Sequence, residues 1–201
     1  FLHGGLTSRD QYLHSLGKAF YSSKNDPYIL VMPKKQEWDW NPDKLKDVVQ
    51  LVSSIIKIDP ERIYLTGLSM GGRGTFIVAG ALPNLFAALM PLSPHHAPYS
   101  YIPLADQVAH LPIWLSHGDA DRISNFDSAK KMFQALKKSG GPKHFNAISG
   151  GTHCCWEKIY GNKTTMEWFL SQQNKRSTPV RTTTWGTIKS NQNIYEKSNK
   201  N

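Results

Sequence analysis

Short apolar runs alternate with amphipathic segments along most of the chain. The runs predict strands, because each is about four to eight residues long and is bounded by turn residues. The segments between them predict helices, because their apolar residues recur at helical spacing. The predicted strands span residues 28–32, 62–66, 86–92, 112–116 and 144–148, and the predicted helices span residues 42–56, 70–82, 128–138 and 164–170. Strands that are apolar throughout and alternate with helices predict an α/β fold, in which helices cover both faces of a mainly parallel sheet.

The helix predicted at residues 42–56 has the clearest end signals. Asn41 suits the N-cap, Pro42 suits the first helical position, and Asp43 favours the positive end of the helix dipole. The apolar residues of this segment form one stripe: Leu45, Val48, Val49, Val52, Ile55 and Ile56. The stripe predicts a helix that packs one face against the sheet.

Composition changes near the C-terminus. The chain of 201 residues is long enough for one domain with a buried core. From residue 174 onward it becomes polar and basic, rich in Thr, Ser, Asn and Lys, which predicts a disordered tail. We therefore divide the chain into one folded domain at residues 1–173 and a tail at residues 174–201.

Much of the positive charge belongs to this tail. The formal net charge is +9, of which the tail carries +5, from six basic residues and one acidic residue. The remaining Lys and Arg residues are scattered over the presumed helix surfaces, so we expect no nucleic-acid partner. No segment approaches the roughly 18 consecutive apolar residues of a membrane span, so we expect no span.

Cysteine and histidine residues show no pattern typical of a metal site. The two cysteines, Cys154 and Cys155, are adjacent, and no Cys-x-x-Cys pair exists. His95 and His96 are also adjacent, which is poor geometry for binding one ion. We therefore expect neither a metal nor a cofactor. The chain begins at Phe1, and the sequence leaves open whether the protein is cytoplasmic or secreted and what its oligomeric state is.

Residues 67–72 read Gly-Leu-Ser-Met-Gly-Gly and match the pattern G-x-S-x-G. The match lies between a predicted strand and a predicted helix, which is the arrangement of a nucleophile elbow. Such an elbow holds its serine on a sharp, strained turn, where Gly67 and Gly71 have no Cβ atoms to collide. The following helix points its first N–H groups at the oxygen on which negative charge develops. We therefore predict that Ser69 is a catalytic nucleophile.

A nucleophilic serine needs a histidine base that a carboxylate orients. In chains with an elbow of this kind, the carboxylate follows the serine along the sequence and the histidine follows the carboxylate. Residues 117–121, His-Gly-Asp-Ala-Asp, offer Asp119 and Asp121 as the acid. Residues 149–153 offer His153 after the last predicted strand. Both segments follow strands, at the sheet edge where open parallel sheets place their sites.

The sequence resembles the compact serine esterases of the α/β-hydrolase superfamily, the branch of dienelactone-hydrolase-like, phospholipase/carboxylesterase-type and polyhydroxybutyrate-depolymerase-like enzymes. Four segments between Phe1 and about residue 173 carry the resemblance: residues 2–5 (Leu-His-Gly-Gly), residues 59–72, the His117-Gly118 turn with Asp121, and residues 151–153 (Gly-Thr-His) followed by Trp156. It implies a carboxylesterase with the triad Ser69, Asp121 and His153, in which Asp119 is a turn residue. It also implies an oxyanion hole made by the backbone N–H groups of Met70 and of Gly5 or Leu6.

The resemblance also bears on the shape of the site. In that fold strands precede the His-Gly-Gly turn, and the sequence shows none, so we expect an exposed sheet edge. The interval at residues 94–111 is too short for a cap domain, which favours an open, shallow site. Residues expected to line a substrate pocket are Leu6, Trp38, Trp40, His95 and Trp156.

Hydrolysis of a small-molecule or polymer-borne carboxylic ester is therefore the leading hypothesis. The same triad also serves serine peptidases and thioesterases, which form a second hypothesis. A third is a catalytically inactive binding module or an incomplete fragment. The intact triad argues against this third hypothesis, and the missing strands argue for it.

Overall fold

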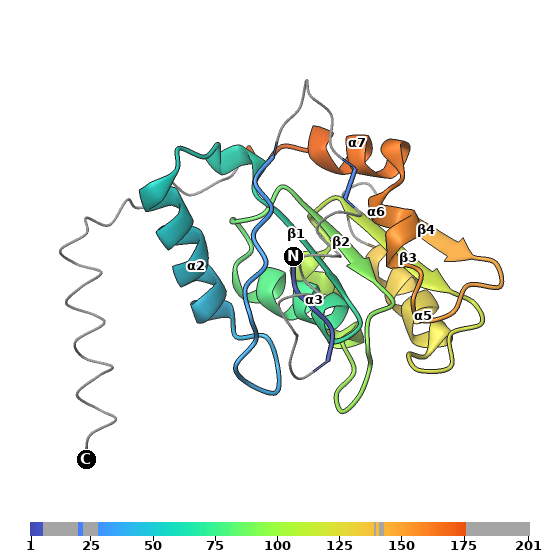
Figure 1. The fold of residues 1–201 in the computed structure, drawn as a ribbon. Helices are drawn as coiled ribbons and strands as arrows, with labels where there is room; N and C mark the ends of the chain where they lie inside the picture. Colours follow the sequence, from blue (N-terminus) through green and yellow to red (C-terminus); the bar gives the residue numbers. More distant parts are fainter. Residues whose placement is uncertain (6–19, 22–27, 139, 141–142, 176–201) are drawn as a thin grey trace, which may run out of the picture.

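A computed structural model describes residues 1–5, 20–21, 28–138, 140 and 143–175. Its centre is a four-stranded sheet in the order β1-β2-β3-β4, and each neighbouring pair is parallel (Figure 1). The strands are β1 (Tyr64–Leu68), β2 (Ala88–Leu92), β3 (Ile113–Gly118) and β4 (Lys143–Ile148). The C-terminal ends of all four strands therefore lie side by side, at what we call the C-terminal edge of the sheet, where loops with different sequences meet.

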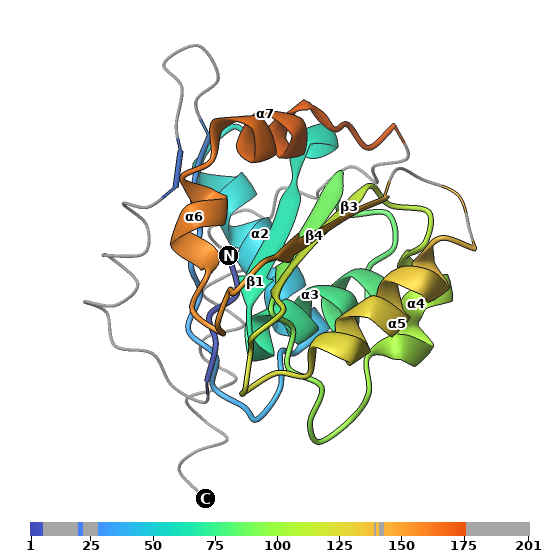
Figure 2. The same ribbon diagram turned by 90° about the vertical axis from the view of Figure 1, so that its right-hand side faces the viewer.

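Helices cover both faces of this sheet (Figure 2). One side holds α2 (Pro42–Ile55), α3 (Met70–Ala81), α4 (Ala105–Val108) and α5 (Phe126–Leu136). The other side holds α6 (Trp156–Tyr160) and α7 (Lys163–Ser171). Single 3-10 turns span Pro60–Arg62 and Ile102–Leu104. The predicted α/β fold with a parallel sheet between two helical layers is confirmed, whereas the short helices α4 and α6 were not predicted.

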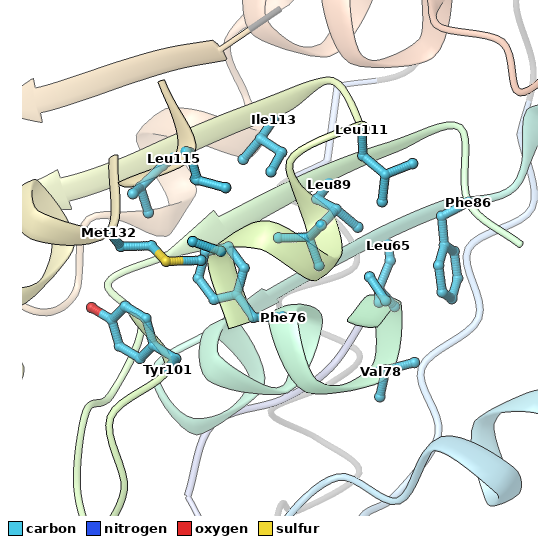
Figure 3. Close-up of a cluster of buried hydrophobic side chains, with 14 of the residues drawn as sticks. Leu65, Phe76, Val78, Phe86, Leu89, Tyr101, Leu111, Ile113, Leu115 and Met132 are labelled. Atoms are coloured by element: carbon cyan, nitrogen blue, oxygen red, sulfur yellow. The ribbon is translucent and has the colours of Figure 1, made fainter. Parts of the chain in front are cut away.

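Alternate strand residues enter two separate cores. Leu65, Leu89, Ile113 and Leu115 are buried with Phe76 and Met132 on the α3 side (Figure 3). Leu68, Ala88, Met90 and Leu92 are buried with side chains of α6 and α7. Because side chains of a strand point alternately to opposite faces, a strand between two helical layers carries apolar residues on both of its faces. This is why the apolar runs of the sequence predicted these strands.

The first described helix, α2, begins and ends almost as predicted. The Asn41 side chain accepts hydrogen bonds from the N–H groups of Asp43 and Lys44, at 3.0 and 3.2 Å. Only Leu45 of the apolar stripe is fully buried, and Ile55 is exposed. Residues in the middle of the stripe instead line an apolar cavity of about 500 Å³ beside β1, together with residues 28–31 and part of α7.

The prediction of a strand at residues 28–32 is wrong. These residues form no ladder, although the main-chain nitrogen of Phe1 donates to the carbonyl of Val31 at 2.7 Å. A strand needs a partner that offers successive hydrogen bonds. Among the described residues of the neighbouring N-terminal segment, Phe1 supplies the one hydrogen bond to residues 28–32, whereas Leu2 forms an isolated parallel bridge to Gly67 on the other side. That bridge covers part of the β1 edge that we expected to be exposed.

At the other end of the chain, Asn174 still packs on the domain. Its backbone N–H donates to the carbonyl of Glu61 at 2.9 Å. The predicted tail otherwise lies at residues 176–201, outside the described residues. No helix within the described ranges is long and apolar enough to cross a membrane.

Candidate active site

Ser69 lies on the tight turn between β1 and α3, in a backbone conformation that L-residues rarely adopt. Its φ is 56° and its ψ is −118°. The Ser69 N–H donates to the carbonyl of Leu92 at 2.9 Å, which ties the turn to β2. A Cβ on Gly71 would lie 2.0 Å from the carbonyl oxygen of Leu2, so only glycine fits there. The surroundings thus hold the serine in a conformation that costs about 1–3 kcal/mol.

Two backbone segments approach the serine, the start of α3 and the Gly4-Gly5 turn. Met70 is the first residue of α3, so its N–H has no partner within the helix. The Gly4-Gly5 turn passes close by, because a Cβ on Gly4 would lie 3.1 Å from the Cβ of Ser69. Gly5 has a φ of 69° and is exposed, and Leu6 lies outside the described residues.

His3 anchors the glycine turn. Its imidazole is fully buried, where burial lowers its pKa. Nδ1 lies 2.9 Å from the carbonyl oxygen of Gly4, and Nε2 accepts from the N–H of Lys35 at 3.0 Å. These two contacts assign the proton to Nδ1. Both ring nitrogens are therefore used to hold the turn.

Asp121, rather than Asp119, lies against His153. Asp121 Oδ2 is 2.8 Å from His153 Nδ1, and the side chains are 0% and 11% exposed. Asp121 Oδ1 accepts from the N–H groups of Ile123 and Ser124, at 2.8 and 2.9 Å. Burial alone would raise the pKa of Asp121, but the hydrogen bonds from His153, Ser124 and Ile123 outweigh it and hold this pKa below its usual value. The exposed Asp119 instead accepts from the N–H of Gly150 at 2.7 Å, as a turn residue does.

The candidate residues follow the four strands in turn, at the C-terminal edge of the sheet. Ser69 comes after β1, His95 after β2, Asp121 after β3 and His153 after β4. His95 donates its backbone N–H to the carbonyl of Ser69 at 2.9 Å, and its Nδ1 lies 3.3 Å from the Ser124 hydroxyl. Burial lowers the pKa of His95.

The expected pocket residues differ in exposure. Trp38 is 56% exposed on the loop before α2, and the ring of Trp156 lies edge-on to His153 with centroids 6.3 Å apart. Trp40, by contrast, is only 3% exposed and belongs to the core. Trp40 therefore offers little surface to a substrate in this structure. Its ring fills the space over Gly74 and packs against His3, because an aromatic loop residue gains more from burial than from exposure.

Two buried cations near the serine were not predicted. Arg73 of α3 pairs with Asp39 and also donates to the carbonyl of Ala97, which joins two loops at the sheet edge. The Lys35 ammonium donates to the carbonyl of Trp38 at 2.9 Å and lies 3.8 Å from the sulfur of Met70. Burial lowers the pKa of Lys35. The one available sequence signal was an arginine within the apolar helix that follows the elbow.

The cysteines differ in environment. Cys154 is exposed, whereas Cys155 is buried with its sulfur 3.6 Å from the hydroxyl of Ser93. Burial raises the pKa of Cys155. No cluster of three or more His, Cys, Asp or Glu side chains suited to a metal occurs in the described part of the chain.

The family model described as "Dienelactone hydrolase family" matches residues 19–167. The 4-O-methyl-glucuronoyl methylesterase of Neurospora crassa is 44% identical over 54 residues, which cover 27% of this chain and 14% of the relative. Cutinase 1 of Thermobifida cellulosilytica is 30% identical over 111 residues, 54% of this chain and 40% of the relative.

Solved structures agree on the fold. A thermostable esterase superposes with a TM-score of 0.59 at 26% identity, over 65% of this chain and 36% of its own. The chain thus spans less than half the length of each of these relatives. The α/β-hydrolase fold expected from the sequence is confirmed.

Proposed function

Because the chain belongs to the dienelactone hydrolase family, we propose that it hydrolyses carboxylic esters through an acyl-enzyme formed on Ser69. One observation carries the proposal: the hydrogen bond of 2.8 Å between Asp121 and His153, at the sheet edge where the strained Ser69 turn also lies. A histidine held through Nδ1 keeps Nε2 free for a proton from a serine hydroxyl.

The proposed reaction has two halves. Ser69 Oγ attacks the ester carbonyl carbon while His153 Nε2 takes the hydroxyl proton. The ester C–O bond then breaks, and His153 returns the proton to the departing alcohol oxygen. Water next attacks the acyl carbonyl, again with His153 as base, and releases the acid and free Ser69. Asp121 keeps the imidazole oriented and stabilises the imidazolium that forms in each half.

The tetrahedral intermediates carry negative charge on the former carbonyl oxygen. The N–H of Met70 and that of Gly5 or Leu6 are the proposed donors to this oxygen. The α3 dipole adds a positive field at the same point. Loss of one such donor reduces kcat by about 10²- to 10³-fold in serine hydrolases.

We propose a small-molecule or polymer-borne ester as substrate. Trp38, Tyr99 and Ile123 are exposed on three different loops at this edge of the sheet. The interval at residues 94–111, described throughout, holds only Ile102–Leu104, α4 and connecting loops. A site without a cap at this edge admits a substrate larger than a closed pocket would accept. The names of the methylesterase and cutinase relatives are consistent with ester chemistry.

Labelling with a fluorophosphonate probe, together with turnover of a short p-nitrophenyl ester, tests the proposal. We expect wild type to be labelled, and Ser69→Ala to lose both labelling and at least about 10³-fold of its turnover. Ser54→Ala, which removes a hydroxyl on the remote helix α2, is the matched control. Labelling that persists in Ser69→Ala, or a cooperatively folded wild type without labelling, would contradict the proposal. Competition among an ester, a thioester and a peptide amide then separates ester hydrolysis from the other acyl transfers.

A further inference from the structure

One carboxylate oxygen of the proposed triad faces two imidazoles. Asp121 Oδ2 lies 2.8 Å from His153 Nδ1 and 3.1 Å from His117 Nε2. The side chains of Asp121 and His117 are both 0% exposed, so water does not compete for these contacts. His117 comes from β3 itself, four residues before Asp121, and is therefore held by the sheet.

The surroundings of His117 define its protonation. Its Nε2 faces two acceptors, Asp121 Oδ2 and the carbonyl oxygen of Ser124 at 3.2 Å, so this nitrogen carries the proton. Its Nδ1 is buried and has no hydrogen-bond partner within the described part of the chain. A second proton would bury an N–H group without an acceptor, and burial lowers the pKa of His117. His117 is thus a neutral donor to the carboxylate.

We propose that His117 is a positioning residue that sets the pH above which the triad works, because it shares the Asp121 oxygen that His153 uses. This inference rests on the proposed function. A donor on Oδ2 withdraws negative charge from that oxygen and weakens its pull on the His153 imidazolium. Without this second donor, the ion pair between Asp121 and the protonated imidazole would be stronger. Catalysis needs the neutral imidazole, so His117 extends activity toward acidic pH.

Other titratable groups near this pair are few among the described residues. His95 approaches from the loop after β2, and Cys155 approaches from the loop after β4. Neither touches Asp121 Oδ2 through a hydrogen bond in the described structure. Both remain in place when His117 is changed, so their effects cancel between variants.

Two substitutions at His117 separate the donor from the space that the ring fills. In His117→Met the donor is lost and an apolar chain remains, whereas in His117→Gln an amide N–H can reach nearly the position of Nε2. We expect the acid limb of the kcat/KM–pH profile to move to higher pH by about 0.5–1 unit in His117→Met. On that limb kcat/KM then falls by about 3- to 10-fold. His117→Gln is expected to restore the wild-type midpoint.

His110→Met removes an exposed histidine that contacts the carbonyl of Pro83, and serves as the matched control. Circular dichroism and thermal melting establish that each variant is folded. A folded His117→Met with an unmoved midpoint, or one displaced to lower pH, overturns the proposal. A merely structural role would lower kcat/KM at every pH and leave the midpoint in place.

A second measurement does not depend on the variants. Nitrogen-15 NMR of histidine-labelled wild type reports which ring nitrogen of His117 carries a proton. We expect the Nε2–H tautomer to persist while the acid limb is crossed. A His117 that gains a second proton in that range overturns the proposal. Fluorophosphonate labelling in the same sample tests the proposed function separately, because labelling requires an activated Ser69 but not this tautomer.

Discussion

The guanidinium of Arg73 pairs with the carboxylate of Asp39, and the two partners are unequally buried. The Arg73 side chain is 2% exposed and that of Asp39 is 30% exposed. The two single substitutions therefore leave different charged groups without a partner. An unpaired guanidinium stays in the protein interior, whereas an unpaired carboxylate can reach water.

We accordingly expect Asp39→Ala to cost more stability than Arg73→Met. Asp39→Ala is expected to lower the free energy of unfolding by about 3–5 kcal/mol, because it strands a buried charge. Arg73→Met keeps an apolar stem in the same space and should cost about 1–2 kcal/mol. Urea unfolding of both variants gives the comparison. Equal costs, or the reverse order, would show that the exposure of Asp39 does not decide the energetics.

Strain at Ser69 predicts that a substitution which relieves its positive φ stabilises the protein. Ser69→Gly relieves the positive φ, while Ser69→Ala removes the same hydroxyl and keeps the strain. We expect both variants to be inactive, and Ser69→Gly to be more stable than Ser69→Ala by about 1 kcal/mol. Thermal melting of the pair measures the difference. An alanine variant at least as stable as the glycine variant would contradict stored strain at this turn.

Close packing of Gly118 against the loop that carries His153 predicts a sensitive position. A Cβ on Gly118 would lie 2.1 Å from the carbonyl oxygen of Gly151. We expect Gly118→Ala to displace that loop, to cost about 1–3 kcal/mol and to lower kcat/KM. Gly80→Ala on α3 is the control, since its Cβ would meet only the flexible side chain of Gln107. That variant should be neutral or gain up to about 1 kcal/mol, as measured by urea unfolding.

Asp121 links stability to pH. Its folded pKa lies below the usual value, so its ionised form contributes stability at every pH above the unfolded pKa of about 3.9. This contribution disappears as pH falls through the lower folded pKa. We expect the difference in unfolding free energy between wild type and Asp121→Asn to shrink on acidification through that window. Urea titrations at a series of pH values measure it, with the exposed Asp127→Asn as control, and a difference that grows on acidification would refute the assignment.

The pattern of apolar residues along the chain correctly predicted the strands that are buried on both faces. Both faces of β1 to β3 are covered, so each strand has the continuous apolar signature that buried strands share. Residues 28–32 carry that signature too, yet form no strand, because strand formation depends on a partner elsewhere in the chain. Helix α6 is only five residues long, too short for an apolar period to show.

The same distinction holds at the candidate site. Ser69 could be proposed from sequence because the elbow constrains five consecutive residues in one short motif. His117 and Arg73 could not, since their importance comes from contacts with Asp121 and Asp39, which only the folded chain brings near. Trp40 is the converse case, because its loop position indicated exposure, but the space over Gly74 accepts its ring.

Cys154 has a practical consequence for measuring ester turnover. Its exposed thiol is the immediate neighbour of His153 along the chain. Activated phenyl esters transfer acyl groups to thiolates as well as to serine, and each transfer releases the same coloured phenol. A burst of colour from the wild type would therefore combine any acylation of Cys154 with that of the proposed nucleophile Ser69. In Cys154→Ser the yield of nitrophenol per chain reports Ser69 without the neighbouring thiol. The double variant Cys154→Ser/Ser69→Ala measures the background.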